Sequence, residues 1–278
     1  MDQRPPLSPD DARALLDWYA AMGVDVGIEE TPQDRFAESA ARKAAAPPPR
    51  ATQSPRAPAA EPAPLPRPGP ADAALGSAEE TASAARAAAA EAATLAELRA
   101  ILERFDGCAL KATASRTVFA DGTPGARVML VGEAPGREED LSGLPFVGRS
   151  GQLLDRMLAA IGLDRSSAYI ANVIPWRPPG NRTPTPQETE TCLPFIRRQI
   201  ELAEPDVLVA LGGAAAQTLF RAKDGILKLR GRWLDYDAGP RRIKAIATLH
   251  PAYLLRSPAQ KKFAWRDLKA IRRALDGE

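Results

Sequence analysis

Four clusters of polar, glycine and proline residues carry the side chains of this chain that could do chemistry. Each cluster follows a short apolar run rich in β-branched residues, in the C-terminal two-thirds of the sequence. The clusters are Gly132 to Asp140, Asn172 to Arg182, Gly212-Gly213, and His250 to Arg256. In an open sheet of parallel strands, ligands bind in the crevice beyond the carboxyl ends of the strands. We therefore expect the four clusters to converge on one site.

The residue types in these clusters exclude several kinds of chemistry. The first cluster lacks the Lys and the Ser or Thr of a phosphate-binding loop, and it lacks the glycine spacing of a dinucleotide fingerprint. No serine occupies the G-x-S-x-G frame of a nucleophile elbow. The chain holds a single histidine, His250, which excludes a metal site built from several histidines.

His250 ends the last apolar run and precedes a loop that suits a nucleic acid. In this loop Arg256 could hold a phosphate, while Leu254 or Leu255 could wedge into a base stack. A purely structural histidine is the alternative interpretation. Residues 226 to 278 contain 13 Lys or Arg against 5 Asp or Glu, although the formal net charge of the whole chain is only +2. Such a local excess suits a polyanion such as nucleic acid, and it also occurs on ordinary solvated surfaces.

The alternation of apolar runs and amphipathic segments predicts the fold. Strands separated by helices pair in parallel, with right-handed crossovers. The expected class is therefore α/β, a three-layer α/β/α sandwich with a four-stranded parallel sheet. The predicted strands are Arg127 to Glu133, Ala168 to Ile174, Asp206 to Leu211 and Lys244 to Leu249. The predicted helices are Thr81 to Phe105, Ser150 to Ile161, Thr185 to Ala203, Gly213 to Phe220 and Lys261 to Leu275.

The first third of the chain has a different composition. A helix start at Ser8 is followed by apolar residues at close to helical spacing, and Gly23 can end this helix. Ten prolines between Ala46 and Ala71 predict a disordered linker. The expected division is a short helical region at 1–30, a disordered Ala/Pro-rich arm at 31–92 and a folded domain at 93–278. Because one short helix is marginal alone, it must dock on the core or on a partner, or stay transient.

The sequence also bounds the compartment and the redox state. No apolar segment reaches the roughly 18 residues needed to span a bilayer, and the N-terminus lacks the apolar stretch of a signal peptide. We therefore expect a cytoplasmic protein without a membrane partner. The two cysteines, Cys108 and Cys192, are too few for a disulfide framework or for a metal site of their own. Reduced, buried thiols are the expected state.

Four motifs in this order resemble those of family 4 uracil-DNA glycosylases over about residues 105 to 275. They are GEAPG at 132–136, LPFVGRSGQLL at 144–154, NVIPWRPPGNR at 172–182 and HPAYLLR at 250–256. The resemblance implies a uracil-DNA glycosylase-like fold and hydrolysis of the N-glycosidic bond of deoxyuridine in DNA. This reaction leaves an abasic site and initiates base excision repair. Chemistry on a base requires flipping it out of the stack, at a cost of a few kcal/mol.

The resemblance also assigns roles in uracil binding. Phe146 corresponds to the aromatic ring on which the flipped uracil stacks, and the alternative is a loop phenylalanine that plugs the core. Asn172 would offer a donor to O4 of uracil and an acceptor to N3–H, unless it is only structural. Cytosine presents the opposite pattern on that edge, so it would leave buried groups unpaired. Ala134, among the backbone amides from Glu133 to Gly136, would line the same pocket.

Two further residues are the expected catalytic groups. His250 would donate a hydrogen bond to O2 as negative charge develops on the departing uracil, most usefully as a neutral imidazole. Glu133 would position water or stabilise the cationic sugar, and a structural or helix-capping carboxylate is the alternative. The expected DNA contacts come from five residues that the motifs carry, namely Arg177, Arg182, Leu254, Leu255 and Arg256.

The chain departs from the family pattern at the iron–sulfur cluster. Proteins similar to it usually hold a [4Fe–4S] cluster with four cysteines, and Cys108 and Cys192 match two of these ligand positions. Phe105 and Trp176 occupy the other two positions. Because a cubane cluster is normally held by four thiolates, we expect no stable cluster and no other metal. An apolar plug of the two aromatic rings against the two thiols is expected in its place.

Two alternatives to the uracil-specific enzyme remain open. One is a glycosylase for another deaminated base, such as hypoxanthine or xanthine. The other is a non-catalytic DNA-binding protein of the same fold. In each case uracil-containing or damaged DNA is the expected partner, the protein is expected to be a monomer, and the N-terminal helix is a candidate docking segment for a repair or replication protein.

Overall fold

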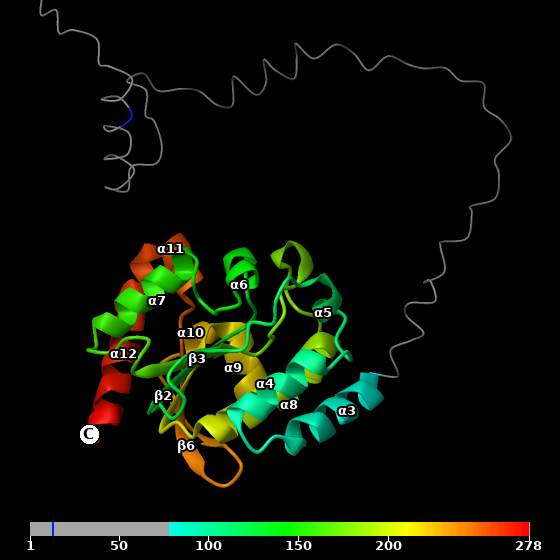
Figure 1. Cartoon of the computed structure of the whole chain (residues 1–278). Coiled ribbons are helices and arrows are strands. Elements are labelled where there is room, and N and C mark those ends of the chain that lie inside the picture. The colour runs from blue at the N-terminus through cyan, green and yellow to red at the C-terminus, as the bar shows by residue number, and fades with distance from the viewer. Residues whose placement is uncertain (1–12, 14–77, 278) are drawn as a thin grey trace, which may run out of the picture. The chain divides into compact units, whose positions relative to one another are not determined.

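The computed structural model of this chain describes Arg13 and residues 78–277 (Figure 1). The predicted N-terminal helix, apart from Arg13, and the predicted linker up to residue 77 lie outside the described residues. None of the described helices is long and apolar enough to span a bilayer.

The described part of the chain alternates strands and helices through most of its length. The strands are β1 (Asp121–Gly122), β2 (Val128–Gly132), β3 (Ala168–Asn172), β4 (Val207–Leu211), β5 (Trp233–Asp237) and β6 (Arg242–Thr248). The longer helices are α3 (Ala78–Glu91), α4 (Leu95–Arg104), α7 (Arg149–Ala159), α8 (Pro186–Ala203), α9 (Gly213–Phe220) and α12 (Lys261–Asp276). The short ones are α5 (Leu110–Thr113), α6 (Arg137–Ser142), α10 (Ile226–Leu229), α11 (Pro251–Arg256), and the 3₁₀ turns η1 (Pro179–Asn181) and η2 (Pro258–Gln260).

The sheet has six strands in the order β1-β3-β2-β4-β6-β5. Its four central strands pair in parallel, as predicted. The expected count of four strands was too low, because β1 and β5 add an antiparallel strand at each edge. Neither edge strand carries the apolar run of a buried strand: β1 has two residues, and β5 exposes most of its side chains.

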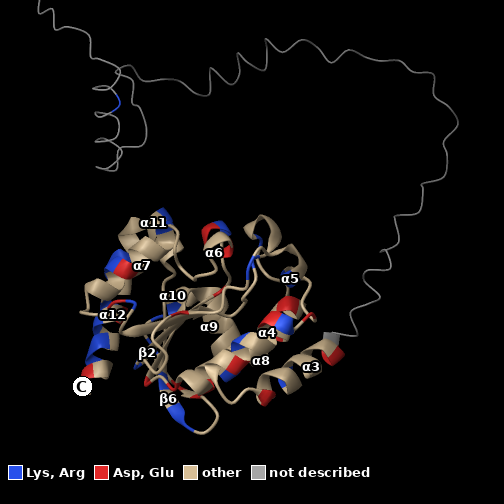
Figure 2. Ribbon diagram, viewed as in Figure 1, with Lys and Arg blue, Asp and Glu red and all other residues tan. Residues whose placement is uncertain are grey.

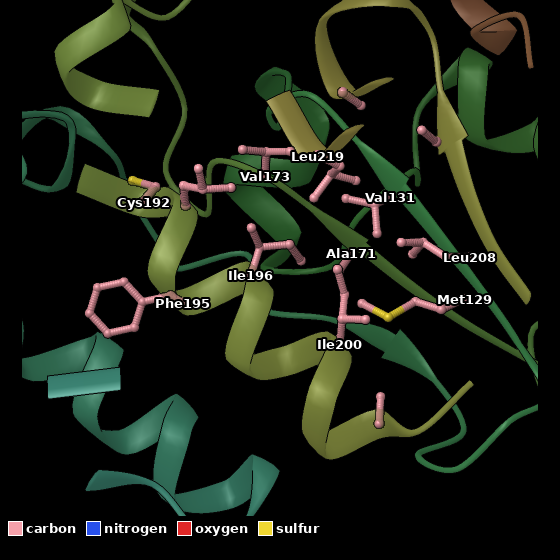
Figure 3. Packing of buried hydrophobic residues seen from close by; sticks show 14 of the residues in the cluster. Met129, Val131, Ala171, Val173, Cys192, Phe195, Ile196, Ile200, Leu208 and Leu219 are labelled. Atoms are coloured by element: carbon pink, nitrogen blue, oxygen red, sulfur yellow. The ribbon is translucent and has the colours of Figure 1, made fainter. Parts of the chain in front are cut away.

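Two helical layers cover the sheet, as expected for an α/β/α sandwich. Alternate residues of β2 point to opposite faces, with Met129 and Val131 packed beneath α8 and α9, and Val128 and Leu130 packed beneath α7 and α12. Figure 1 places α3, α4 and α8 on one side of the sheet and α7, α11 and α12 on the other. In Figure 3, Ile196 and Ile200 of α8 extend toward the sheet residues that they cover.

The predicted helix from Thr81 to Phe105 is instead two helices, α3 and α4. Thr94 begins α4 with a capping box, because its hydroxyl accepts the N–H of Glu97 and the Glu97 carboxylate accepts the N–H of Thr94. The predicted boundary at residue 93 also lies too late in the chain, since α3 packs on α8 through a stripe of alanines that includes Ala85 and Ala89.

The register of the sheet brings the ends of its strands to one edge. Gly132, the last residue of β2, pairs with Asn172, the last residue of β3. Leu211 at the end of β4 pairs with Thr248 at the end of β6. The segments that follow these residues therefore start side by side, as expected for a parallel sheet.

Candidate active site

A cavity of about 350 Å³ lies beyond the carboxyl ends of β2, β3 and β6. Three of the four predicted clusters line it, and the loop between α6 and α7 contributes a further wall. The fourth cluster does not line the cavity and lies against His250: Gly212 has a φ of +94°, and an added Cβ there would lie 3.0 Å from Cβ of His250. The predicted site residues that line the cavity are Glu133, Ala134, Phe146, Asn172, Arg182, His250 and Arg256.

Asn172 ends β3 and is 5% exposed. Its side-chain amide has no hydrogen-bond partner among the described residues, so its donor and its acceptor are both available to a ligand in the cavity. Both polar atoms of the amide are open to the cavity, since none of the enclosed side-chain nitrogen or oxygen atoms of the described residues lacks a hydrogen-bond partner. Asn172 is therefore placed and unpaired as a recognition group would be.

Phe146 places its ring in the cavity from a strained backbone position. Its φ is +55°, a left-handed conformation that side chains with a Cβ rarely adopt. The ring is 4% exposed and lies against the imidazole of His250, with the centroids 5.5 Å apart and the planes tilted by 33°. Gly151 makes this packing feasible, because an added Cβ at that position would overlap the Phe146 carbonyl.

His250 is fixed by its position as the N-cap of α11. Its Nδ1 accepts the backbone N–H of Ala252 at 3.1 Å, so in the neutral ring the proton resides on Nε2. Burial, reinforced by the positive charge of Arg256, lowers the pKa of His250 to about 4. The imidazole is consequently neutral at physiological pH and has one N–H to donate.

Glu133 follows β2 directly and is half-buried at the cavity wall. Burial raises the pKa of its carboxyl group above the ordinary value of 4.5. No hydrogen bond to this carboxylate occurs among the described residues, which leaves its oxygens available to water or substrate. Ala134 continues the same wall.

Glu139 is a buried carboxylate that the sequence interpretation did not single out. It accepts backbone N–H groups from Gly136 at 3.1 Å, Val147 at 3.0 Å and Gly148 at 3.1 Å. The carboxylate thus joins the wall after β2 to the segment that carries Phe146. Three N–H donors compensate the buried charge. In the sequence Glu139 is one of three consecutive acidic residues, which is equally typical of an exposed first helical turn.

The residues expected to contact DNA fall into two groups. Arg182 pairs with both carboxylate oxygens of Glu188, and Arg177 donates to Oδ1 of Asn181 at 2.7 Å, so both order the loop after β3. Arg256 lines the cavity, and Leu255 is 38% exposed beside it.

Leu254 does not occupy the position expected of a wedge. The segment predicted as a loop is the helix α11, and its periodicity turns Leu254 into the core, where it is 1% exposed. Of the two leucines, Leu255 alone is available at the surface. In Figure 2, blue stretches of the ribbon mark further Lys and Arg residues along α12, which belongs to the basic C-terminal segment.

The two cysteines lie together in the core. Their sulfur atoms are 3.9 Å apart, and Cys192 donates to Cys108. The ring of Trp176 is 1% exposed, with its Nε1 donating to Thr117 Oγ1 at 3.1 Å, and the ring of Phe105 packs edge-on against Phe195 with centroids 5.0 Å apart. Trp176, Phe195 and both cysteines belong to one apolar cluster, and the partly buried Phe105 packs against it.

This cluster does not fit an iron–sulfur group. A [4Fe–4S] cluster requires four ligands, normally thiolates, whereas the whole chain has two cysteines. In the part of the chain that the structure describes, no three His, Cys, Asp or Glu side chains are arranged to hold a metal ion.

Comparison with known proteins identifies relatives of the part of the chain that builds the cavity. A family model described as the uracil DNA glycosylase superfamily matches residues 119–269. The type-4 uracil-DNA glycosylase of Archaeoglobus fulgidus is 43% identical over 168 residues, which cover 59% of this chain and 84% of that protein. The type-4 enzyme of Thermotoga maritima is 43% identical over 157 residues, covering 56% and 80%. That of Pyrobaculum aerophilum is 36% identical over 178 residues, covering 63% and 91%.

Proposed function

The chain belongs to the uracil-DNA glycosylase superfamily, and we propose that it hydrolyses the N-glycosidic bond of deoxyuridine in DNA. The products are free uracil and an abasic site, with which base excision repair begins. The observation that carries the proposal is the shared cavity. A ring (Phe146), an amide (Asn172), an imidazole (His250) and a carboxylate (Glu133) from distant parts of the sequence all line it. The compartment we propose is the cytoplasm, where this DNA would be met.

Uracil is recognised by its edge and by its face. The flipped base stacks on Phe146, and the amide of Asn172 donates to O4 while its oxygen accepts N3–H. Cytosine carries an amino group in place of O4 and an unprotonated N3. The amide N–H would therefore face a donor, and the amide oxygen would face an acceptor. In a site as buried as that of Asn172, such mismatched groups cost several kcal/mol.

Bond cleavage depends on His250 and Glu133, two residues of the cavity wall whose pKa values are shifted by burial. The neutral imidazole of His250 donates its Nε2–H to O2 of uracil, where negative charge accumulates as the bond to the sugar breaks. The Glu133 carboxylate positions the attacking water or stabilises the cationic sugar. Arg256 holds a phosphate of the DNA, and Leu255 fills the space from which the base has been flipped.

We further propose that this reaction proceeds without an iron–sulfur cluster. The support is the replacement of two expected thiolates by Phe105 and Trp176: Trp176 is buried in the same apolar cluster as both cysteines, and the partly buried Phe105 packs against that cluster. Iron analysis of protein made under anaerobic, iron-replete conditions tests this proposal. Colourless, active protein with less than one iron per chain supports it, whereas brown protein with about four irons per chain refutes it.

A panel of oligonucleotides tests the substrate assignment. Each carries one uracil, hypoxanthine, xanthine or mismatched thymine, and abasic sites are counted after alkaline cleavage. We expect cleavage at uracil well above cleavage at the other three bases. Stronger cleavage at hypoxanthine or xanthine would favour a glycosylase for another deaminated base. No cleavage of any oligonucleotide would indicate a DNA-binding protein without this activity.

A further inference from the structure

We propose that Arg165 is a positioning residue for the uracil-stacking ring of Phe146, an inference that rests on the proposed function. Arg165 lies between α7 and β3, and it does not line the cavity. Its guanidinium nevertheless reaches the backbone of the cavity wall, donating from Nη1 to the carbonyl of Pro145 at 3.1 Å and from Nη2 to the carbonyl of Phe146. Arg165 thus fixes the peptide groups on which the orientation of the ring depends.

The backbone at Phe146 needs such support because its conformation is unfavourable. A φ of +55° brings Cβ close to the carbonyl oxygen that follows it, so a phenylalanine there tends to relax to a right-handed or extended conformation. Such relaxation would swing the ring out of the cavity. Residues in this region persist where the surrounding structure fixes them, and these positions cluster at ligand sites.

The guanidinium is itself held in place from two sides. Its Nε pairs with Asp155 of α7 at 2.8 Å, and Nη1 pairs with Asp121 of β1. The planar fork of an arginine has five donors in fixed directions, which matches two carboxylates and two carbonyls at once. A lysine, with a single flexible ammonium group, cannot reproduce this arrangement.

The opposite side of the same segment is held by Glu139. Its carboxylate accepts the N–H groups of Val147 and Gly148, while Arg165 donates to the two preceding carbonyls. Residues 145 to 148 are therefore clamped by an acceptor on one side and a donor on the other. The Glu139 contacts alone leave the carbonyl of Phe146 free, and that carbonyl defines the peptide plane beside the strained φ.

A double-mutant cycle in the full-length protein tests the proposal. The variants are Arg165→Met, Phe146→Ala and the combination of both. Arg127→Met is the matched control, because Arg127 also pairs with a carboxylate, on Asp206 at 2.7 Å, and donates to a backbone carbonyl, that of Leu275, but at the opposite end of β2. Single-turnover uracil release, inhibition by free uracil and the melting temperature are measured for each variant.

We expect Arg165→Met to slow uracil release by about 100-fold and to weaken inhibition by free uracil, since a misplaced ring stacks poorly. Arg127→Met should stay within about twofold of wild type in both measurements. In the Phe146→Ala background, Arg165→Met should change release by no more than about twofold, because the ring through which it acts is absent. Arg165→Lys should release uracil about as slowly as Arg165→Met, because a lysine cannot make the same set of hydrogen bonds.

Other outcomes would overturn the proposal. One is an Arg165→Met variant that releases uracil as fast as Arg127→Met. The other is an Arg165→Met substitution that slows release by the same factor in the wild-type and the Phe146→Ala backgrounds. If Arg165→Met does not fold, Asp155→Asn takes its place in the cycle, since it loosens the guanidinium while keeping the arginine, and additivity with Phe146→Ala then refutes the inference. Absence of uracil release by the wild type would refute the proposed function instead.

Discussion

The side-chain oxygen of Asn172 occupies the space beside the α-carbon of Gly132, at the end of the neighbouring strand. A Cβ atom added to Gly132 would overlap this oxygen, and it would lie 2.6 Å from Cζ of Phe146. The absence of a side chain at Gly132 therefore lets the amide that we propose reads the uracil edge and the ring that we propose stacks on its face approach the same volume.

Substitution Gly132→Ala should disrupt uracil binding by displacing the amide, the ring or both. We expect kcat/KM for a uracil oligonucleotide to fall by about 100-fold, with a loss of stability of about 1–3 kcal/mol. Gly225→Ala is the matched control, because an added Cβ there meets no atom within 4 Å and its φ is −69°. Equal activity in the two variants would show that Gly132 does not shape the site.

The pH dependence should separate the roles of Glu133 and His250. Burial raises the pKa of the Glu133 carboxyl above 4.5, and only its ionised form assists the reaction, so kcat/KM should fall as the pH decreases through that raised pKa. His250, with a pKa of about 4, stays mostly neutral between pH 4.5 and 8 and should add no second titration in this range. The measurement is single-turnover uracil release between pH 4.5 and 8.

Glu133→Gln is the control for this assignment. It should be slower than wild type, and its remaining activity should be independent of pH until His250 itself gains a proton near pH 4. If the acidic decline persists unchanged in Glu133→Gln, another group causes it and the assignment to Glu133 is wrong.

Stability should follow the titration of His250 over a defined window. The unfolded histidine has a pKa of about 6.5 and the folded one about 4, so between these values the unfolded state binds more protons. The contribution of neutral His250 is complete above pH 6.5 and decreases as the pH falls, by up to about 3 kcal/mol. Urea unfolding of wild type and His250→Asn at several pH values measures how the free energy of unfolding of each protein depends on pH. The same pH dependence in the two proteins would contradict the lowered pKa.

The replaced cluster ligands make a gain-of-function experiment feasible. The double variant Phe105→Cys, Trp176→Cys restores the number of thiols to four, and we expect it to acquire about four irons per chain when reconstituted anaerobically. Without iron it should be less stable than wild type by about 3 kcal/mol or more, because two large side chains leave a cavity. A double variant that binds no iron would show that these positions are not the missing ligand sites.

Helix α3 should contribute to stability although its residues were assigned to a linker. Ala85 is fully buried and packs in the cluster with α8, so Ala85→Leu should destabilise the protein by about 1–3 kcal/mol through overpacking. The exposed Ala87 in the same helix gives the control, and Ala87→Leu should change stability by less than about 0.5 kcal/mol. Thermal or urea unfolding distinguishes the two, and equal stabilities would mean that α3 does not pack firmly.

Sequence alone was sufficient to predict the four central strands of the sheet and the site residues at their carboxyl ends. Strands buried on both faces are continuous apolar runs, which is how β2, β3, β4 and the buried second half of β6 were recognised. Glu133 and His250 lie just after such runs and Asn172 ends one, so their convergence was predictable from the direction of parallel strands. The edge strand β5 was missed because its residues are mostly exposed and its partner is the strand after it.

The supporting groups of the site were not predictable in the same way. Glu139 and Arg165 occur in charged stretches that are typical of solvent-exposed surfaces, and only the folded chain brings both to the backbone around Phe146. The difference between Leu254 and Leu255 also required the structure, because it depends on α11 being a helix rather than a loop. Contacts between residues distant in sequence decide these roles, and local patterns do not record them.

The most direct measurement of the central claim is uracil release from an oligonucleotide with one deoxyuridine, by wild type, Asn172→Ala and His250→Ala at matched melting temperatures. The account predicts rapid release by the wild type. It predicts release slower by about 10-fold or more for Asn172→Ala and by about 100-fold for His250→Ala, since one loses base recognition and the other the donor to O2. Release at the wild-type rate by both variants would contradict it.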